Sequence, residues 1–178
     1  MSKKISRRDF IKTTAAAGGA AALMPQTLFS SQAKMKLRIG FIGTGLRGQW
    51  MLWLATKYPD VEIPAICDID DGMISSALKI IKDSGRKEPK VYKKNDDDFR
   101  NMLKDEELDG VYIATPWEWH HPMAVAAMEA GSHVGTEVPA ALTVNECWDL
   151  VNVSEKTGKF CMIMENVCYR RDVMAVLN

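Results

Sequence analysis

Short apolar runs alternate with stretches of helical spacing from residue 36 onward. The apolar runs predict strands at residues 37–42, 63–67, 111–115, 132–137 and 160–165. In the intervening stretches apolar residues recur every three or four positions, which predicts helices at residues 46–57, 73–83, 122–130 and 143–156. Strands that alternate with helices are typical of a parallel sheet with crossover helices. We therefore expect an α/β fold with a doubly wound parallel sheet.

The ends of the predicted elements carry signals of their own. Pro122 suits the first turn of a helix, and Thr143 with Glu146 forms the pattern of a capping box. The charged stretch at residues 82–98 is interpreted as a solvated connection. Residues 170–178 predict a new amphipathic helix without a stop signal, so we expect a C-terminal substrate domain to be absent from this chain.

Three glycines follow the first predicted strand directly. Gly43, Gly45 and Gly48 form a Gly-x-Gly-x-x-Gly pattern at the start of a predicted helix. The first permits a tight turn, the second lets a pyrophosphate approach the backbone, and the third lets the helix pack closely on the strand. The helix N-terminus then presents unpaired N–H groups to the phosphates. The pattern predicts a dinucleotide-binding domain of the Rossmann type.

Asp68 lies 20 positions after Gly48, at the end of the second predicted strand. A carboxylate there can accept hydrogen bonds from the adenosine ribose, and its charge repels a 2′-phosphate. NAD is therefore favoured over NADP as the cofactor. The alternative is a structural turn followed by an unrelated acidic helix cap.

A loop rich in aromatic residues follows the third predicted strand, at the edge where open parallel sheets bind ligands. Between two prolines it contains Trp117, Glu118, Trp119, His120 and His121. Either tryptophan ring can cover a flat face of the cofactor, while Glu118 and His120 can contact polar groups. The alternative is a lid of packed aromatic residues with His121 as a helix cap.

The last two predicted strands also end in polar residues. Glu137 follows one strand, and Asn166 follows the other. Both follow the carboxyl ends of their strands, so we expect both to face the nicotinamide half of the cofactor. For Glu137 the alternative is an ordinary buried acid paired with a backbone amide.

The N-terminal residues have the pattern of an export signal. Basic residues precede a weakly apolar, alanine-rich run at residues 13–24, and small residues suited to cleavage follow at 31–33. The run is too short and too mildly apolar for a membrane span. Residues 6–12, which contain Arg7 and Arg8, closely resemble the twin-arginine motif. That pathway carries folded proteins, which suits a domain that must collect its cofactor before it leaves the cytoplasm.

We therefore divide the chain into a twin-arginine export signal at residues 1–33 and an NAD-binding domain at residues 34–178. The translocase is an expected partner, and the destination is the periplasm or the cell surface. Residues 1–33 hold five basic side chains and one acidic one, so the remainder has 18 basic against 22 acidic side chains. This balance excludes a nucleic-acid partner.

Cysteine spacing gives no indication of a metal site. The four cysteines stand at positions 67, 147, 161 and 168, without the spacing of metal ligands. Cys67 and Cys161 lie in predicted strands, so they are interpreted as unpaired, small core residues.

Several strings resemble the Gfo/Idh/MocA oxidoreductases. They are the Ala-Thr-Pro loop at 114–116, Gly-x-His-Val at 131–134 and Glu-x-Pro at 137–139. Within that superfamily the chain is most similar to glycoside hydrolase family 109, the NAD-dependent α-N-acetylgalactosaminidases. The strings that carry this similarity lie at residues 45–48, 117–120, 135–141 and 164–170.

The resemblance implies a set of cofactor contacts beyond the first two glycines, Gly43 and Gly45. They would be Leu46, Arg47, Asp68, Trp117, Glu118, Trp119, His120, Glu137, Val138 and Asn166. The catalytic acid and base groups would come largely from a C-terminal domain. By itself the chain is therefore expected to hold NAD without cleaving a glycoside.

Val138 separates two chemistries within the superfamily. Sugar and polyol dehydrogenases have Glu-Lys-Pro, whose lysine assists proton transfer, whereas the valine here cannot move a proton. The resemblance thus implies a glycosidase acting on terminal N-acetylgalactosamine by transient oxidation at C3, elimination, hydration and re-reduction. The alternatives are a sugar dehydrogenase and a non-catalytic NAD-binding module. A homo-oligomer is left open.

Overall fold

The computed structural model describes residues 36–177, and the export signal lies outside this part of the chain. Its strands form one parallel sheet in the order β4-β3-β1-β5-β6-β7, with β2 beside the start of β1. The strands are β1 (Leu37–Ile42), β2 (Val61–Glu62), β3 (Ala65–Cys67), β4 (Lys90–Tyr92), β5 (Gly110–Ile113), β6 (His133–Thr136) and β7 (Cys161–Ile163).

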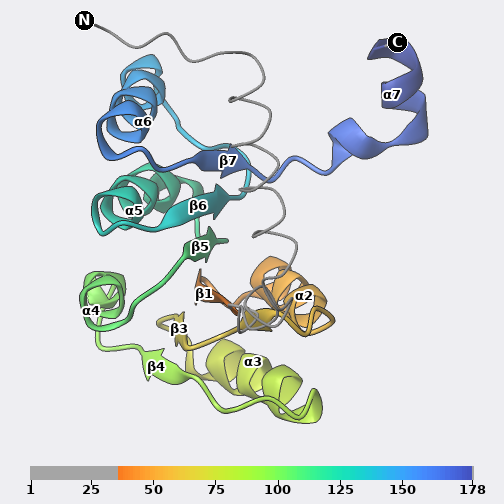
Figure 1. Cartoon of the computed structure of the whole chain (residues 1–178), viewed down its shortest axis with the longest axis vertical. Coiled ribbons are helices and arrows are strands. Elements are labelled where there is room, and N and C mark those ends of the chain that lie inside the picture. Colours follow the sequence, from red (N-terminus) through yellow and green to blue (C-terminus); the bar gives the residue numbers. More distant parts are fainter. Residues whose placement is uncertain (1–35, 178) are drawn as a thin grey trace, which may run out of the picture. The chain divides into compact units, whose positions relative to one another are not determined.

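Helices cover both faces of the sheet. They are α2 (Leu46–Ala55), α3 (Asp71–Asp83), α4 (Asp98–Asp105), α5 (Trp117–Glu129), α6 (Val144–Thr157) and α7 (Arg171–Leu177), with the 3₁₀ helix η2 (Val167–Tyr169) before the last. Figure 1 shows α2 and α3 on one side of the sheet and α4, α5 and α6 on the other. The predicted doubly wound Rossmann-type α/β fold is confirmed.

Two hydrophobic clusters correspond to these two layers. One joins Leu52 of α2 and Ile81 of α3 to Phe41 and Ile66 on the sheet. The other joins α4, α5 and α6 to the opposite face, with Phe99 and other side chains fully buried. The apolar positions that predicted helices therefore form the core of each layer.

The chain reverses direction across the sheet between β4 and β5. β1 is followed by β3 and β4 on one side, and β5 then returns to pair with β1 on the other side. Loops that leave β1 and β5 at their carboxyl ends therefore diverge to opposite faces. This topological switch point is where open α/β sheets form their ligand crevice.

Two predictions about secondary structure are wrong. The stretch at residues 82–98 is more than a solvated connection, because it contains β4, whose Tyr92 is buried. Helix α5 begins at Trp117, five residues before the predicted start, and Pro122 lies inside it. Proline removes one helical hydrogen bond and its ring crowds the carbonyl four residues earlier, yet α5 continues past it to Glu129.

Other local predictions are confirmed. Thr143 and Glu146 form the capping box of α6, with Glu146 N donating to the Thr143 hydroxyl at 3.2 Å. The helix expected at residues 170–178 is α7. No helix of the described residues is long and apolar enough to cross a membrane.

Candidate functional site

The glycine turn between β1 and α2 has the geometry that a dinucleotide requires. Gly43 has a φ of +85°, and a Cβ there would lie 2.5 Å from the Ala114 carbonyl oxygen. A Cβ on Gly48 would lie 2.1 Å from the Gly43 carbonyl oxygen, so only glycine lets α2 pack this closely. By contrast, a Cβ on Gly45 would have nothing within 4 Å. The space beside Gly45 is thus open for a ligand.

Asp68 follows β3 and holds the glycine turn. Its Oδ2 accepts hydrogen bonds from the Thr44 amide at 2.5 Å and from the Thr44 hydroxyl at 2.9 Å. Its Oδ1 accepts from the Asp70 amide at 3.0 Å. The carboxylate is therefore fixed at the mouth of the turn, and its contact with the ribose stays a prediction.

A cavity of about 300 Å³ lies between the glycine turn and the loops after β3 and β5. Its lining includes Gly43, Gly45, Asp68, Thr115, Pro116 and Trp119. The cavity thus combines an apolar wall with two carboxylates, Asp68 and Asp96, and the N-terminus of α2. A site of this composition fits the adenosine half of a dinucleotide.

The residues expected in an aromatic loop form the first turn of α5 instead. Trp117 is 63% exposed, and Glu118 is also exposed at the helix N-terminus. Trp119 is half-buried and packs edge-on against Phe99, with ring centroids 6.3 Å apart. Three side chains of one helical turn therefore lie in different environments, because Trp117 and Glu118 are exposed and Trp119 is half-buried.

His120 does not face the cavity, contrary to the expectation from the sequence. Its side chain is buried, with the residue 1% exposed. Its Nδ1 lies 2.7 Å from the Pro139 carbonyl oxygen, and its Nε2 lies 2.8 Å from the Thr115 carbonyl oxygen. The ring therefore joins the loops that follow β5 and β6. His121 pairs with Asp149 of α6 at 2.9 Å rather than capping the helix.

Glu137 follows β6 and is paired through its side chain. Its Oε1 accepts from Arg47 Nε at 2.7 Å and from the Tyr112 hydroxyl. The alternative reading, a pair with a backbone amide, therefore does not describe it. This contact joins the end of β6 to the glycine turn, because Arg47 stands in the first turn of α2. Hydrogen bonding to Glu137 raises the pKa of Arg47, so its guanidinium stays charged.

Tyr112 is a residue of this group that sequence reasoning missed. It lies on β5, two positions before Ala114, inside the apolar run that predicted the strand. Burial, followed by the Glu137 carboxylate, raises the pKa of its phenol. The hydroxyl therefore stays protonated and acts as a donor. The signal in the sequence that could have identified it is a tyrosine near the end of a predicted strand, because a buried tyrosine hydroxyl usually has a hydrogen-bond partner.

Leu46, Val138 and Asn166 are all at the surface. Leu46 begins α2 beside the open space at Gly45, and Val138 is 39% exposed after β6. Asn166 is exposed at the start of the turn before η2. The structure thus places all three beyond the carboxyl ends of strands, and their assignment as cofactor contacts stays a prediction.

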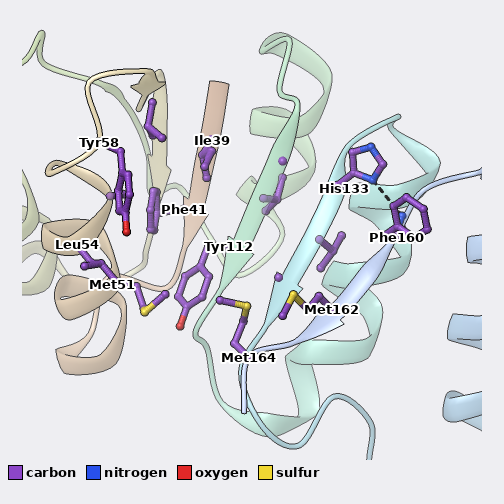
Figure 2. Close-up of a pocket in the computed structure, with 16 residues that line it drawn as sticks. Ile39, Phe41, Met51, Leu54, Tyr58, Tyr112, His133, Phe160, Met162 and Met164 are labelled. Carbon is purple, nitrogen blue, oxygen red and sulfur yellow. Dashed lines mark hydrogen bonds between the residues drawn. The ribbon is translucent and has the colours of Figure 1, made fainter. Parts of the chain in front are cut away.

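A second, larger cavity of about 530 Å³ lies on the face of the sheet beside α2. Figure 2 shows the side chains that line this cavity, among them Phe41, Met51, Met162 and Met164. At its far end Phe160 stacks on His133, with ring centroids 5.4 Å apart. It contains neither the glycine turn nor Asp68, so it lacks the donors that phosphates need.

The described cysteines are free thiols and belong to no cluster of metal-ligating side chains. Among the described residues no group of three His, Cys, Asp or Glu side chains could hold a metal ion. None of the four cysteines forms a disulfide. Cys67 is buried, and desolvation raises its pKa to about 12, while Cys161 is half-buried with its pKa raised to about 11 by the same cause. Both are therefore unreactive thiols.

Two family models match the chain. Residues 37–165 match the oxidoreductase family with an NAD-binding Rossmann fold, the Gfo/Idh/MocA model. Residues 4–24 match the signal sequence of the twin-arginine translocation pathway. The predicted cofactor, NAD, and the predicted export signal are confirmed by these matches.

Named relatives agree with the more specific resemblance. A glycosyl hydrolase family 109 protein from Parabacteroides distasonis is 52% identical over 97% of this chain and 41% of its own length. An α-N-acetylgalactosaminidase from Tannerella forsythia is 50% identical over the same shares. The resemblance to family 109 is thereby confirmed. The chain spans about two fifths of the length of these relatives.

Solved structures share the fold. An NAD-binding protein from Listeria innocua is 26% identical and superposes with a TM-score of 0.65 over 79% of this chain and 39% of its own. Scyllo-inositol dehydrogenase from Lactobacillus casei, solved with NAD(H) and scyllo-inositol, is 19% identical with a TM-score of 0.67 over the same shares. At 19% identity, the likeness to scyllo-inositol dehydrogenase shows the fold alone. With a family model that matches most of its length, the chain belongs to the Gfo/Idh/MocA oxidoreductase family and has its NAD-binding Rossmann fold.

Proposed function

We propose that this chain is the NAD-holding part of an exported, NAD-dependent glycosidase that acts on terminal N-acetylgalactosamine. The observation that carries the proposal is Val138. It is exposed directly after Glu137 at the carboxyl end of β6, where the resemblance expects a lysine in the dehydrogenases. A valine cannot transfer a proton, so this chain does not supply the group that assists oxidation of a free alcohol. The names of the relatives support the same reaction class.

The residues of the crevice divide between the two halves of NAD. Asp68 and the cavity beside Gly45 would hold the adenosine ribose, and the N-terminus of α2 at Leu46 would face the pyrophosphate. Glu137 and Asn166, after β6 and β7, would face the nicotinamide half. Trp117, at the exposed start of α5, would cover the cofactor from the side of the solvent.

The proposal gives His120 an indirect role. His120 has both ring nitrogens engaged by backbone carbonyls, so it would support the site through Thr115 and Pro139 rather than touch the cofactor. Glu118 and Trp119 stay candidates for direct contact with the cofactor, because they follow Thr115 and Pro116 within about one helical turn. We propose that Trp119 forms part of the adenosine wall, because it lines the cavity that contains Asp68.

The proposed chemistry regenerates its cofactor. When bound, NAD supplies a hydride acceptor and donor at one place, so that a sugar can be oxidised at C3, lose its aglycone by elimination, and be hydrated and reduced again. The paired carboxylates of ordinary glycosidases are not required for this route. Export in the folded state suits it, because an enzyme in the periplasm or at the cell surface meets little fresh NAD.

The test uses a fusion of residues 34–178 to the part of the Parabacteroides distasonis relative that follows the matched segment. We expect NAD-dependent release of nitrophenol from a nitrophenyl N-acetylgalactosaminide, with no net formation of NADH. Steady NADH formation with a free sugar or polyol would support the second candidate, a dehydrogenase, which the match to the oxidoreductase family model favours. The unmodified relative serves as the control for activity of the assay.

Assembly is a separate prediction. A homo-oligomer was left open by the sequence, and analytical ultracentrifugation of the purified protein would determine its state. The translocase remains the expected partner during export, because the twin-arginine match lies at residues 4–24.

A further inference from the structure

One oxygen of Glu137 is held by two donors from different parts of the fold. Arg47 comes from the first turn of α2, and Tyr112 comes from the middle of the sheet on β5. Both donate to Oε1, and the Glu137 side chain is 12% exposed. Within the described residues, Oε2 receives no hydrogen bond. One oxygen is thus fixed by the protein, and the other keeps its capacity to accept.

The position of Tyr112 is itself rigid. The residue is 5% exposed, and its ring packs on Phe41 with centroids 5.6 Å apart. Figure 2 shows the ring between Met51 of α2 and Met164 after β7. A ring packed on both sides has few rotamers available, so its hydroxyl marks a fixed point for a partner.

Tyr112 and Arg47 are not equivalent donors. The Arg47 side chain is 36% exposed and also lies over the Trp50 ring, 5.3 Å from its centroid. An exposed guanidinium on a flexible stem can exchange partners when an anionic ligand arrives. The buried phenol cannot move in this way, because its ring is held in the core. Tyr112 is therefore the donor that would keep Glu137 in place when a phosphate competes for Arg47.

Glu137 lies far from the adenosine cavity. It follows β6, whereas Asp68 follows β3, and the strands between them are β1 and β5. At the usual spacing of about 4.8 Å between strands, the two carboxylates belong to positions about 14 Å apart across the sheet. A change at Glu137 should consequently affect only the half of a dinucleotide that lies away from Asp68.

We propose that Tyr112 is a positioning residue for NAD: its buried hydroxyl fixes Oε1 of Glu137, so that Oε2 is presented to the nicotinamide half of the cofactor. The inference rests on the proposed placement of NAD along the strand ends. Tyr112 itself does not touch the cofactor.

The test measures two ligands on matched tyrosine variants by calorimetric titration. Tyr112→Phe removes only the hydroxyl, and Tyr92→Phe is the control, because Tyr92 is also buried and its hydroxyl also bonds a carboxylate, Glu106, at 3.0 Å. We expect Tyr112→Phe to bind NAD about 10- to 100-fold more weakly, on the scale of one hydrogen bond to a charged group. AMP, which has only the adenosine half, should bind as it does to the unaltered protein. Tyr92→Phe should bind both ligands normally.

A double variant separates positioning from general damage. In a Glu137→Ala background there is no carboxylate to position, so adding Tyr112→Phe should not weaken NAD binding further. Unchanged NAD affinity in Tyr112→Phe overturns the proposal. Equal weakening of NAD and AMP, or additive losses in the double variant, overturns it as well, because either indicates a merely structural role. If the unaltered protein binds AMP but not NAD, the proposed placement of the nicotinamide half fails first, and the role of Tyr112 fails with it.

Discussion

Asp68 and Thr44 are joined by two hydrogen bonds to a single carboxylate oxygen. The amide and the hydroxyl of Thr44 both donate to Oδ2 of Asp68, at 2.5 and 2.9 Å. Thr44 stands between the first two glycines of the turn, so Asp68 shapes the phosphate-binding loop as well as facing the adenosine cavity. The carboxylate therefore has a structural role in the turn, and the contact to the ribose that the sequence suggests stays a prediction.

Asp68→Ala should weaken NAD binding by about 1 to 3 kcal/mol, the scale for losing hydrogen bonds to a charged group. It should also reduce discrimination against NADP, because the charge that repels a 2′-phosphate is gone. Calorimetric titration with both dinucleotides measures the two effects. Thr44→Val is the control, because it removes one hydrogen bond to Asp68 and leaves the carboxylate. An Asp68→Ala protein with unchanged NAD affinity would show that the ribose assignment is wrong.

Gly45→Ala should impair NAD binding, whereas Gly48→Ala should lower the stability of the fold. A Cβ on Gly45 meets no atom within 4 Å, and its φ of −62° suits alanine, so Gly45→Ala should melt at nearly the same temperature. Its methyl group nevertheless occupies the space for the pyrophosphate, and NAD affinity should fall at least about tenfold.

Gly48→Ala should instead lower the melting temperature. Its Cβ would approach the Gly43 carbonyl oxygen to 2.1 Å, so α2 must move away from the turn. Overpacking of this kind costs about 1 to 3 kcal/mol of unfolding free energy. Thermal unfolding followed by circular dichroism checks both variants, and equal melting temperatures for the pair would contradict the reading of the turn.

His120→Ala should destabilise the protein by about 1 to 3 kcal/mol, since two carbonyl groups lose their shared partner in a buried place. His121→Ala is the matched control. Its ring pairs with Asp149, whose side chain is half exposed, and such pairs contribute less than about 1 kcal/mol. Urea unfolding measures both. A His120 variant as stable as the His121 variant would mean that the ring does not hold the two loops together.

The export signal makes a prediction outside the described residues. Replacing Arg7 and Arg8 together by lysine keeps the charge but removes the guanidinium groups, so the precursor should stay in the cytoplasm. Immunoblots of cell fractions measure this. Export at the normal level in the double-lysine variant would contradict the twin-arginine reading, whereas a Lys3, Lys4 double alanine variant should still be exported.

The sequence was most informative where one local pattern has one physical solution. The run at residues 37–42 is β1 to the residue, and Gly43 and Gly48 have the turn and packing roles expected of them. The steric limit on Gly48 is set by Gly43, a near neighbour in the chain, so it can be recognised without knowing the rest of the fold. The limit on Gly43 comes from Ala114 on another strand, and only the fold shows it.

Two elements in or beside the charged region were missed. β4 has three residues, of which Tyr92 alone is buried, and many charged residues surround it. Helix α4 was hidden in the same charged region, although Phe99, Met102 and Leu103 have helical spacing. Their burial comes from packing against α5 and β3, which no local pattern reports.

Pairings across the sheet could not be predicted either. Arg47 meets Glu137 over 90 positions of sequence, and His120 joins Thr115 to Pro139 from inside a helix that was expected to start later. The residue types were identified as functional, but their partners depend on strand order. Strand order was not available from the periodicity alone.

The central claim is that NAD lies across the carboxyl ends of the strands, from Asp68 to Glu137. Backbone-amide NMR of isotope-labelled protein, titrated with NAD, tests it most directly. We expect shifts at Gly45, Asp68 and Glu137, and none at Phe160 on the apolar cavity beside α2. Shifts confined to that apolar cavity, or no shifts at saturating NAD, would contradict the account.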